Sequence, residues 1–406
     1  MKPGSPSADT GTEGIHRAAR IILSFLTVVG AISTDFFVMS LPNVAATLGS
    51  SPAETQLAVS AFVITFGFGQ VFWGPLSDRF GRRPVLFTAL GLYVVSCVGC
   101  AFAWNIETLI AWRFIQGFGA CSGPLIARAI VRDAYRGEEA SRLVAFMAIV
   151  LGITPILAPL AGVMVSEFLG WRYLFVAMAL AVGSMIVAVA LALPETSSPS
   201  RTGKGLLVQW AAAHGAHMRN PRLLFQIFLV GLCGSSVFSF ISGSSFVYVE
   251  AIGASAIAYS LAFMSTGAGY VCGATALMRS TAGERRNLRT GLGCWTAGGL
   301  ALAIIAFIDL PHGLDGILIL TLPIIFYMFG LGYVLPIATA RALAAAERDA
   351  GAASGLIGMF QYLCAAGGGV MVALLSNGTH FGMCAVLAVS PLLALLAMGA
   401  RYAWAR

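Results

Sequence analysis

The chain has 406 residues, of which 58% are hydrophobic and only 10% are charged. A soluble domain carries roughly 25% charged residues, so a soluble fold of this composition would expose apolar surface everywhere. The net charge of +7 does not indicate a nucleic-acid partner, because the basic residues gather in alternate loops between apolar stretches. The composition therefore predicts a protein embedded in a lipid bilayer.

Twelve apolar stretches follow one another along the chain. Each is long enough to cross about 30 Å of hydrocarbon as a helix, and none shows the alternation of a membrane β-strand. Only helices and closed barrels satisfy the backbone in lipid, so we expect an all-α membrane protein with twelve transmembrane helices. The stretches lie roughly at residues 20–48, 55–74, 85–104, 107–131, 143–167, 171–193, 222–249, 255–279, 290–309, 315–341, 353–376 and 380–401.

The polar segments divide the chain into two halves. Residues 1–18 are polar and predict a disordered cytoplasmic tail, and residues 195–221 contain the longest interior polar stretch. We therefore expect an N-terminal bundle of six helices over 19–194, a cytoplasmic linker over 195–221 and a C-terminal bundle of six helices over 222–406.

A weak internal repeat supports two related halves. The tetrapeptide Gly-Val-Met-Val occurs at Gly162–Val165 in the fifth stretch and again at Gly369–Val372 in the eleventh. Repeats of this kind are typical of transporters that place a site between two pseudo-symmetric bundles.

The distribution of basic residues predicts the orientation. If the N-terminus and every second loop are cytoplasmic, only Arg172 of the 24 basic residues falls outside and only Arg113 falls well inside a span. This bias predicts cytoplasmic termini. The outer loops carry acidic residues instead, namely Glu54, Glu107, Glu167, Glu250, Asp309 and Asp315.

Asp35 is the only one of the 17 acidic residues deep within a span, and none of the five histidines is deep. A charge at mid-bilayer is costly and marks a functional hypothesis. Apolar surroundings favour the neutral form of a carboxyl group, so Asp35 is the first candidate for a proton carrier. The alternative is a structural Asp that is hydrogen-bonded within the bundle.

Arg113 is the only deep basic residue and is expected at a similar depth. Asp35 lies roughly 21 Å from the cytoplasmic start of its span, and Arg113 roughly 9 Å from the outer start of its own. In a core of about 30 Å these depths coincide and allow a direct or water-bridged pair. The alternative for Arg113 is that its side chain snorkels to the outer interface.

Polar and aromatic side chains at helical spacing predict that spans 1, 4, 7, 8 and 11 line a central cavity. A simpler reading is that the hydroxyls bond their own backbone while the aromatic rings pack in the core. The side chains expected to contact substrate are Phe36, Met39, Gln116, Ser239, Ser242, Phe246, Tyr259, Phe263 and Gln361.

Glycine and proline predict where helices pack closely or bend. Gly119-x-x-x-Gly123 and Gly269-x-x-x-Gly273 are typical of close helix contacts. Pro155 and Pro159, one turn apart, are expected to kink the fifth span, where Gly162 follows. We assign these three residues of the fifth span to conformational gating.

No cofactor or metal site is predicted. Cys97 and Cys100 have C-x-x-C spacing, but no second pair or nearby His completes a metal site. No G-x-x-x-x-G-K-[ST] motif for ATP occurs. Any energy source is therefore expected to be an ion, with the proton as the coupling ion.

The segment Gly74–Pro84 resembles the signature of the major facilitator superfamily, G-x-L-x-D-R-x-G-R-R/K, and matches it throughout. The resemblance runs from about residue 20 to 400 and implies the major facilitator fold, with two pseudo-symmetric six-helix bundles. It also implies that this loop latches the cytoplasmic side between conformations. The gating residues that it supplies are Gly74, Asp78, Arg79, Gly81, Arg82 and Arg83.

Three other motifs narrow the resemblance. Arg113-x-x-Gln116-Gly117-x-Gly119 resembles the fourth-span motif of proton-coupled members, and Ser33-Thr34-Asp35 with Leu41-Pro42 resembles the bicyclomycin-resistance type of drug:proton antiporter, which includes phenicol exporters. The fifth span resembles the antiporter motif G-P-x-x-G-G. It departs from that motif by Ala158 before Pro159 and by Ala161 before Gly162.

The resemblance implies proton-coupled efflux of lipophilic drugs across the bacterial inner membrane by alternating access. We expect the protein to be a monomer. One alternative is a proton-coupled importer or facilitator of a small metabolite with the same fold. Another is a membrane-embedded enzyme or a non-transporting receptor, but one deep Asp and one deep Arg do not supply the nucleophile–base pair or metal cluster that a membrane hydrolase needs.

Overall fold

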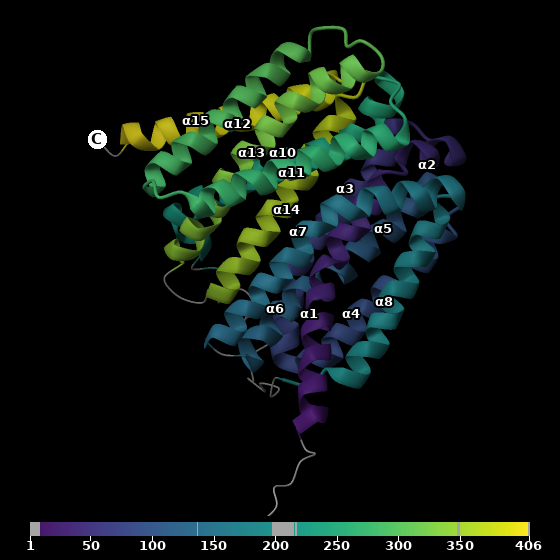
Figure 1. Cartoon of the computed structure of the whole chain (residues 1–406), viewed down its shortest axis with the longest axis vertical. Helices are drawn as coiled ribbons and strands as arrows, with labels where there is room; N and C mark the ends of the chain where they lie inside the picture. Colours follow the sequence, from purple (N-terminus) through teal and green to yellow (C-terminus); the bar gives the residue numbers. More distant parts are fainter. Residues whose placement is uncertain (1–8, 136, 197–214, 216, 347–349, 405–406) are drawn as a thin grey trace, which may run out of the picture.

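The computed structural model describes residues 9–135, 137–196, 215, 217–346 and 350–404, and every regular element in this part of the chain is a helix (Figure 1). The helices of the first half are α1 (Asp9–Val38), α2 (Leu41–Leu48), α3 (Pro52–Phe80), α4 (Arg82–Ala101), α5 (Ile106–Ala120), α6 (Ser122–Ala134), α7 (Gly137–Phe168) and α8 (Arg172–Ala192). Those of the second half are η1 (His217–Arg219), α10 (Pro221–Phe246), the π-helix η2 (Val247–Ala251), α11 (Ala256–Arg279), α12 (Glu284–Ile305), α13 (Leu314–Ala345), α14 (Ala350–Leu374) and α15 (Phe381–Trp404).

Most of these helices are long and apolar enough to cross a membrane. Within the described residues, 11 spans meet that criterion. Helix α7 occupies the place of the remaining expected span: it is 32 residues long and contains the shorter apolar segments Arg142–Leu151 and Leu157–Phe168. The predicted all-α, multi-pass membrane fold is confirmed.

The N-terminal boundaries differ from those expected. Helix α1 already begins at Asp9, within the segment 1–18 that was predicted to be a disordered tail; residues 1–8 lie outside the described part. The first apolar stretch, 20–48, is two helices, because the chain turns at Met39 and Ser40 before α2 begins. Pro42 lies at the start of α2, where a residue without an N–H is tolerated.

The helices form two bundles. In the first, α1 packs on α6 and α7, α3 packs on α5, and α4 packs between α5 and α8; in the second, α13 packs on α10, α11 and α12, and α15 packs on α10 and α12. The bundles meet where α3 contacts α14 and where α7 contacts α11. In each case the second span of one half contacts the fifth span of the other, as a two-fold relation between the halves requires.

The predicted sequence repeat occupies equivalent positions in the two halves. A Cβ atom added at Gly162 of α7 would lie 3.1 Å from the backbone of Phe36 in α1. One added at Gly369 of α14 would lie 3.5 Å from the hydroxyl of Ser242 in α10. Gly162 therefore lets α7 approach α1 closely, whereas the nearest neighbour at Gly369, 3.0 Å from the added Cβ atom, is the hydroxyl of Ser60 in α3 of the other half.

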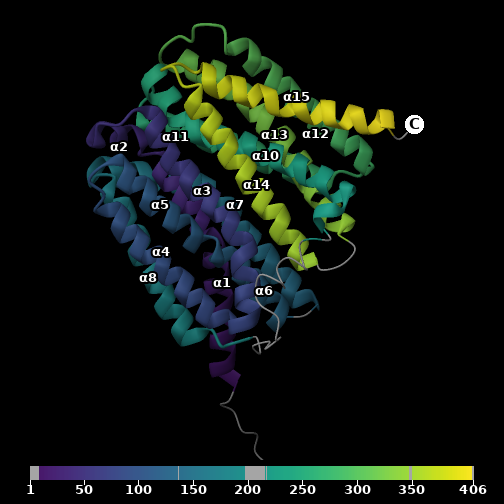
Figure 2. The same ribbon diagram turned by 180° about the vertical axis from the view of Figure 1, so that it is seen from behind.

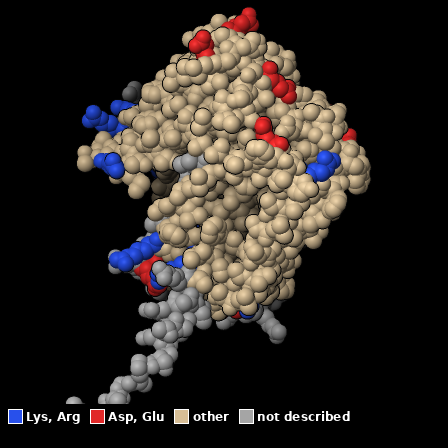
Figure 3. Space-filling model, turned by 45° about the vertical axis from the view of Figure 1, so that its right-hand side comes forward, with Lys and Arg blue, Asp and Glu red and all other residues tan. Residues whose placement is uncertain are grey.

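The two ends of the molecule differ in charge and in how closely the two bundles lie against each other. We call the end that carries Arg82, Arg132 and Arg285 the basic end, and the end that carries Glu54 and Glu250 the acidic end. The bundles lie against each other toward the acidic end and diverge toward the basic end (Figures 1 and 2). In Figure 3 two groups of basic side chains lie on the left, one on each bundle, and the surface between them is hollowed.

Candidate functional site

Asp35 lies on the face of α1 that is directed toward the second bundle. Its side chain is buried, and within the described residues it makes no hydrogen bond or ion pair. Met39, one turn further on the same face, accepts a weak hydrogen bond from the hydroxyl of Ser260 in α11. The adjacent Tyr259 lies within electrostatic reach of Asp35. A buried carboxyl without a protein partner thus lies at the junction of the bundles.

Arg113 is enclosed by the first bundle. Its Nη1 atom donates to the carbonyl oxygen of Ser33 at 3.2 Å and to Oε1 of Gln116 at 2.6 Å. Its guanidinium carbon lies 4.5 Å from the ring centre of Phe37 and 4.3 Å from that of Phe62. Both aromatic faces stabilise the cation, while Nε and Nη2 have no hydrogen-bond partner in the protein.

Arg113 reaches the backbone of α1 two residues before Asp35, so the two residues lie at a similar level along the bundle. The two side chains nevertheless form no ion pair among the described residues. Helical geometry gives the reason: Ser33 faces α4, where its hydroxyl meets that of Tyr93 at 2.6 Å. Asp35 lies two residues, or roughly 200°, further round the helix and faces away from Arg113.

Gln116 also lies inside the first bundle and not at the junction. It is fully buried, accepts from Arg113 and donates from Nε2 to the sulfur of Cys97 at 2.9 Å. The structure therefore makes Gln116 a partner of Arg113, whereas the sequence had suggested contact with substrate. Phe36 lies beside the junction, with its backbone against Gly162.

The polar stripe of α10 lies against α14 and α3. Cβ atoms added at Gly368 and Gly369 would lie 2.5 Å from the hydroxyl of Ser239 and 3.5 Å from that of Ser242. The hydroxyl of Ser60 in α3 would lie 3.0 Å from the same Cβ position at Gly369. None of these three hydroxyls has a hydrogen-bond partner in the protein, so polar groups of both bundles meet here without satisfying each other.

The predicted aromatic residues of α11 pack within the second bundle. The Tyr259 hydroxyl lies 2.8 Å from that of Ser244, and the Phe263 ring stacks on Phe240 with centres 5.3 Å apart. Gln361 of α14 packs its aliphatic stem against Gly234. Phe246 lines a small cleft at the acidic end.

An aromatic cluster that joins the bundles was missed by the sequence analysis. The ring of Phe66 in α3 lies 4.6 Å from that of Tyr362 in α14, and the Tyr362 ring lies 6.1 Å from Phe238 in α10. A spacing pattern within one helix cannot reveal a contact between three helices. Tyr362 does follow Gln361 directly, so the correct segment of α14 had been singled out.

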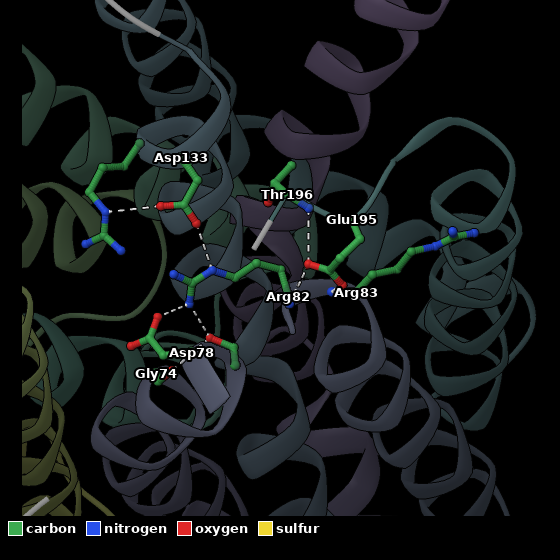
Figure 4. A network of polar contacts seen from close by, with 9 residues as sticks. Gly74, Asp78, Arg82, Arg83, Asp133, Glu195 and Thr196 are labelled. Atoms are coloured by element: carbon green, nitrogen blue, oxygen red, sulfur yellow. Dashed lines mark hydrogen bonds and ion pairs between the residues drawn. The ribbon is translucent and has the colours of Figure 1, made fainter. Parts of the chain in front are cut away.

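The turn between α3 and α4 is built around Arg82 (Figure 4). Its side chain is buried and forms ion pairs with Asp78 at 2.5 Å and with Asp133 of α6 at 2.9 Å. It also donates to the hydroxyl of Ser77 at 2.6 Å. Arg82 therefore ties α3 and α4 to the basic end of α6.

Glu195, which follows α8, contacts the same turn at the basic end. Its carboxylate accepts hydrogen bonds from the backbone N–H groups of Arg82 and Arg83 at 2.9 and 3.0 Å (Figure 4). An anion is stabilised at the start of a helix, where N–H groups are unpaired. Gly81 makes this approach feasible: its φ of +97° suits glycine, and a Cβ there would lie 2.9 Å from Glu195.

The other predicted gating residues are placed as follows. A Cβ atom at Gly74 would meet only Leu125, at 4.0 Å, and Arg79 lies over the ring of Phe80. Helix α7 continues through Pro155 and Pro159; the side chain of Pro155 lies outside the described residues, and the kink stays a prediction.

Asp133 and Glu195 were missed, although acidic residues beside Arg132 and after the sixth span stand out among basic loops.

The comparison with known families agrees with this architecture. Residues 23–369 match the Major Facilitator Superfamily. The chain belongs to this superfamily. It is therefore a multi-pass membrane transporter and not an enzyme.

Curated relatives and a solved structure share most of the chain. It is 31% identical to a chloramphenicol resistance protein of Pseudomonas aeruginosa, over 71% of this chain and 68% of that protein. It is 24% identical to a bicyclomycin resistance protein homolog of Haemophilus influenzae, over 91% and 94%. The xylose transporter XylE from E. coli, in a partially occluded inward open conformation, superposes with a TM-score of 0.71 at 15% identity, covering 94% and 96% of the two chains.

Proposed function

We propose that this transporter exports lipophilic drugs across the bacterial inner membrane in exchange for protons, by alternating access. The observation that carries the proposal is Asp35, a buried carboxyl without a protein partner at the junction of the two bundles. Relatives named for resistance to chloramphenicol and bicyclomycin support a drug as the substrate. No nucleic acid or cofactor enters the proposal, and the working unit is a monomer.

The orientation follows from charge. Basic loops remain in the cytoplasm, so the basic end and both termini would be cytoplasmic. The bundles diverge toward that end (Figure 1), so on this orientation the structure would correspond to an inward-facing state. In that state substrate would enter from the cytoplasm or the inner leaflet.

The coupling step would use Asp35 in two protonation states. In the outward-facing state the carboxyl takes a proton, and in the inward-facing state the drug and the proton compete for the junction. Arg113 contacts α1 through Ser33. A shift of α1 that accompanies protonation of Asp35 would therefore change the hydrogen bonds of Arg113 to Ser33 and Gln116. Moving one elementary charge across a membrane potential of about 100 mV releases roughly 2.3 kcal/mol of free energy. This free energy supports a drug concentration gradient of about fifty-fold per proton.

The test is drug-driven proton release from purified protein in detergent, with chloramphenicol and bicyclomycin as probes. We expect release from the wild type, none from Asp35→Asn, and unchanged release from the control Glu107→Gln, which removes an acid at the acidic end. Release that persists in Asp35→Asn would remove Asp35 from coupling. If neither drug releases protons from the wild type, uptake of metabolites into proteoliposomes would be measured instead, because an importer of the same fold would then be favoured.

A further inference from the structure

Several arginines gather at the turn between α11 and α12, at the basic end of the second bundle. Their side chains are exposed, and none of them forms an ion pair among the described residues. We call this set the arginine cluster; its members are Arg279, Arg285, Arg286 and Arg289. The cluster therefore presents positive charge that no carboxylate of the described residues neutralises.

The carboxylate within this segment is already engaged. Glu284 is the only acidic residue between Arg279 and Arg289. Its Oε1 atom accepts a hydrogen bond from Nε of Arg341 in α13 at 2.6 Å and lies 2.5 Å from Nη2 of the same side chain. Glu284 thus joins α12 to α13 and leaves the arginine cluster without a partner.

Arginines of the first bundle at the same end do have carboxylate partners. Arg20 pairs with Glu139, and Arg82 pairs with Asp133. The retention of basic residues on the cytoplasmic side explains why both bundles carry arginines at this end. It does not explain why the members of the arginine cluster lack such partners.

The turn that carries the cluster is held in place by Asn287, whose side chain is buried. Its Oδ1 atom accepts a hydrogen bond from the hydroxyl of Ser280 at 2.7 Å, and its Nδ2 atom donates to the carbonyl oxygen of Ala282 at 3.1 Å. These bonds tie the residues that follow α11 to the start of α12. The arginines on the two sides of the turn are therefore kept near one another.

Two arginines of the cluster lie on the side of α12 that is turned away from the second bundle. Helix α12 packs on α13 and α15, and its buried side carries Leu288, Leu292 and Trp295. At about 100° per residue, Arg286 lies opposite these residues and Arg289 lies beside Arg286. We call this side the outward side of α12; in a bilayer it faces lipid.

The outward side becomes apolar further along the helix. A Cβ atom added at Gly293, one turn beyond Arg289, would meet nothing within 4 Å. Leu300 is 50% exposed and Ile304 is 67% exposed. A phospholipid has the same order of groups, because its phosphate lies at the membrane surface and its acyl chains extend into the hydrocarbon.

We propose that the arginine cluster and the outward side of α12 bind one anionic phospholipid, with its phosphate at the arginines and an acyl chain along Gly293, Leu300 and Ile304. Guanidinium groups bind phosphate oxygens through paired N–H donors, and clusters of basic residues next to a membrane span attract anionic lipids. A zwitterionic headgroup is disfavoured, because the arginines repel its own cation. A free phosphate ion makes no use of the apolar side.

This inference goes beyond the proposed drug export, and its test needs neither a transported drug nor proton coupling. The experiment locates the bound lipid on the purified full-length protein in detergent. The probe is phosphatidylglycerol with a diazirine group in one acyl chain; phosphatidylcholine with the same acyl chains is the neutral control. After illumination the protein is digested with chymotrypsin, whose cleavage does not depend on arginine, and the cross-linked residues are identified by mass spectrometry.

The expected result is cross-linking of phosphatidylglycerol to α12 beyond Arg289, at concentrations about tenfold or more below those that phosphatidylcholine requires. Unlabelled phosphatidylglycerol should compete with the probe, whereas glycerol phosphate, the headgroup without acyl chains, should not. Equal cross-linking of α12 by the two lipids, or no cross-linking of α12 by either, would overturn the proposal. Competition by glycerol phosphate as strong as that by the lipid would do the same.

Two double variants test the assignment to the cluster. Arg286→Gln with Arg289→Gln should raise the phosphatidylglycerol concentration at half-maximal cross-linking of α12 by about tenfold or more. Arg219→Gln with Arg222→Gln is the matched control, since it removes the same charge from exposed positions at the same end of the second bundle, outside α12. The control should leave that concentration unchanged; an equal rise in both double variants would show that net charge alone attracts the lipid and would refute the site.

Discussion

The guanidinium of Arg113 donates a hydrogen bond to the carbonyl oxygen of Ser33, 3.2 Å away. This bond joins α5 to α1 two residues before Asp35, on the opposite face of α1 from the carboxyl. Arg113 is therefore stabilised by a backbone oxygen, an amide and two aromatic rings instead of by a carboxylate. Asp35 supplies none of these contacts, so they do not depend directly on its charge.

Arg113→Lys should lower stability, because an ammonium group cannot reproduce the planar contacts with Phe37 and Phe62 together with both hydrogen bonds. We expect a loss of about 1–3 kcal/mol, measured as a lower thermal unfolding temperature in detergent. Arg79→Lys is the matched control, since Arg79 lies at the basic end over Phe80 only. Equal unfolding temperatures for both variants would contradict the importance of the Arg113 contacts.

The two glycines of the α3–α4 motif should respond differently to alanine. Gly81→Ala places a Cβ in a left-handed backbone conformation, at a cost of about 1–2 kcal/mol, and 2.9 Å from the carboxylate of Glu195. Gly74→Ala adds a methyl group that meets only Leu125, at 4.0 Å. Thermal unfolding and drug-driven proton release should therefore be impaired in Gly81→Ala and nearly normal in Gly74→Ala; the reverse order would refute this reading of the turn.

The two acidic partners of Arg82 should contribute unequally. The Asp133 side chain is 21% exposed and that of Asp78 is 58% exposed, and an ion pair weakens as solvent screens it. Asp133→Asn should therefore cost more stability than Asp78→Asn, by about 1 kcal/mol or more. Parallel thermal melts of the two variants check the difference, and a larger loss for Asp78→Asn would show that the exposed pair dominates.

Gly162→Val should disturb α1 beside Asp35. The valine side chain would meet the backbone of Phe36, which cannot move aside as a flexible side chain can. Overpacking of this kind lowers the stability of a protein by about 1–3 kcal/mol. Gly183→Val in α8 is the control, because nothing lies within 4 Å of a Cβ at Gly183. We expect reduced proton release only in Gly162→Val, and a normal response there would argue against close packing of α7 on α1.

Much of the fold could be predicted from the sequence, since lipid allows few solutions. An apolar stretch of about 20 residues in lipid must be helical, and the regular placement of arginines predicted which ends share a side. The break at Met39 was not foreseen, because Leu41 and Pro42 are as compatible with a bent span as with a new helix. The start of α1 at Asp9 was not foreseen, because a polar composition that is typical of disorder does not exclude a helical extension.

The site was predicted less completely than the fold. Asp35 and Arg113 emerged by elimination, since charge is rare in the spans. Their depth was predictable from the rise per residue, but their failure to pair was not, because it depends on how far each helix is rotated about its axis. Gln116 was assigned to substrate for the same reason: the sequence places it one turn from Arg113 without showing which side faces the other bundle.

By itself, the sequence determined that this protein is a multi-pass helical membrane protein with two related halves, because those properties follow from composition, length and the positions of charges. Only the tertiary structure decided that Arg113 contacts Ser33 and that Glu195 caps the start of α4. These contacts join residues that are 80 and 113 positions apart in the chain. Such contacts depend on the rotation and crossing of helices, which are decided by side-chain packing across the whole bundle.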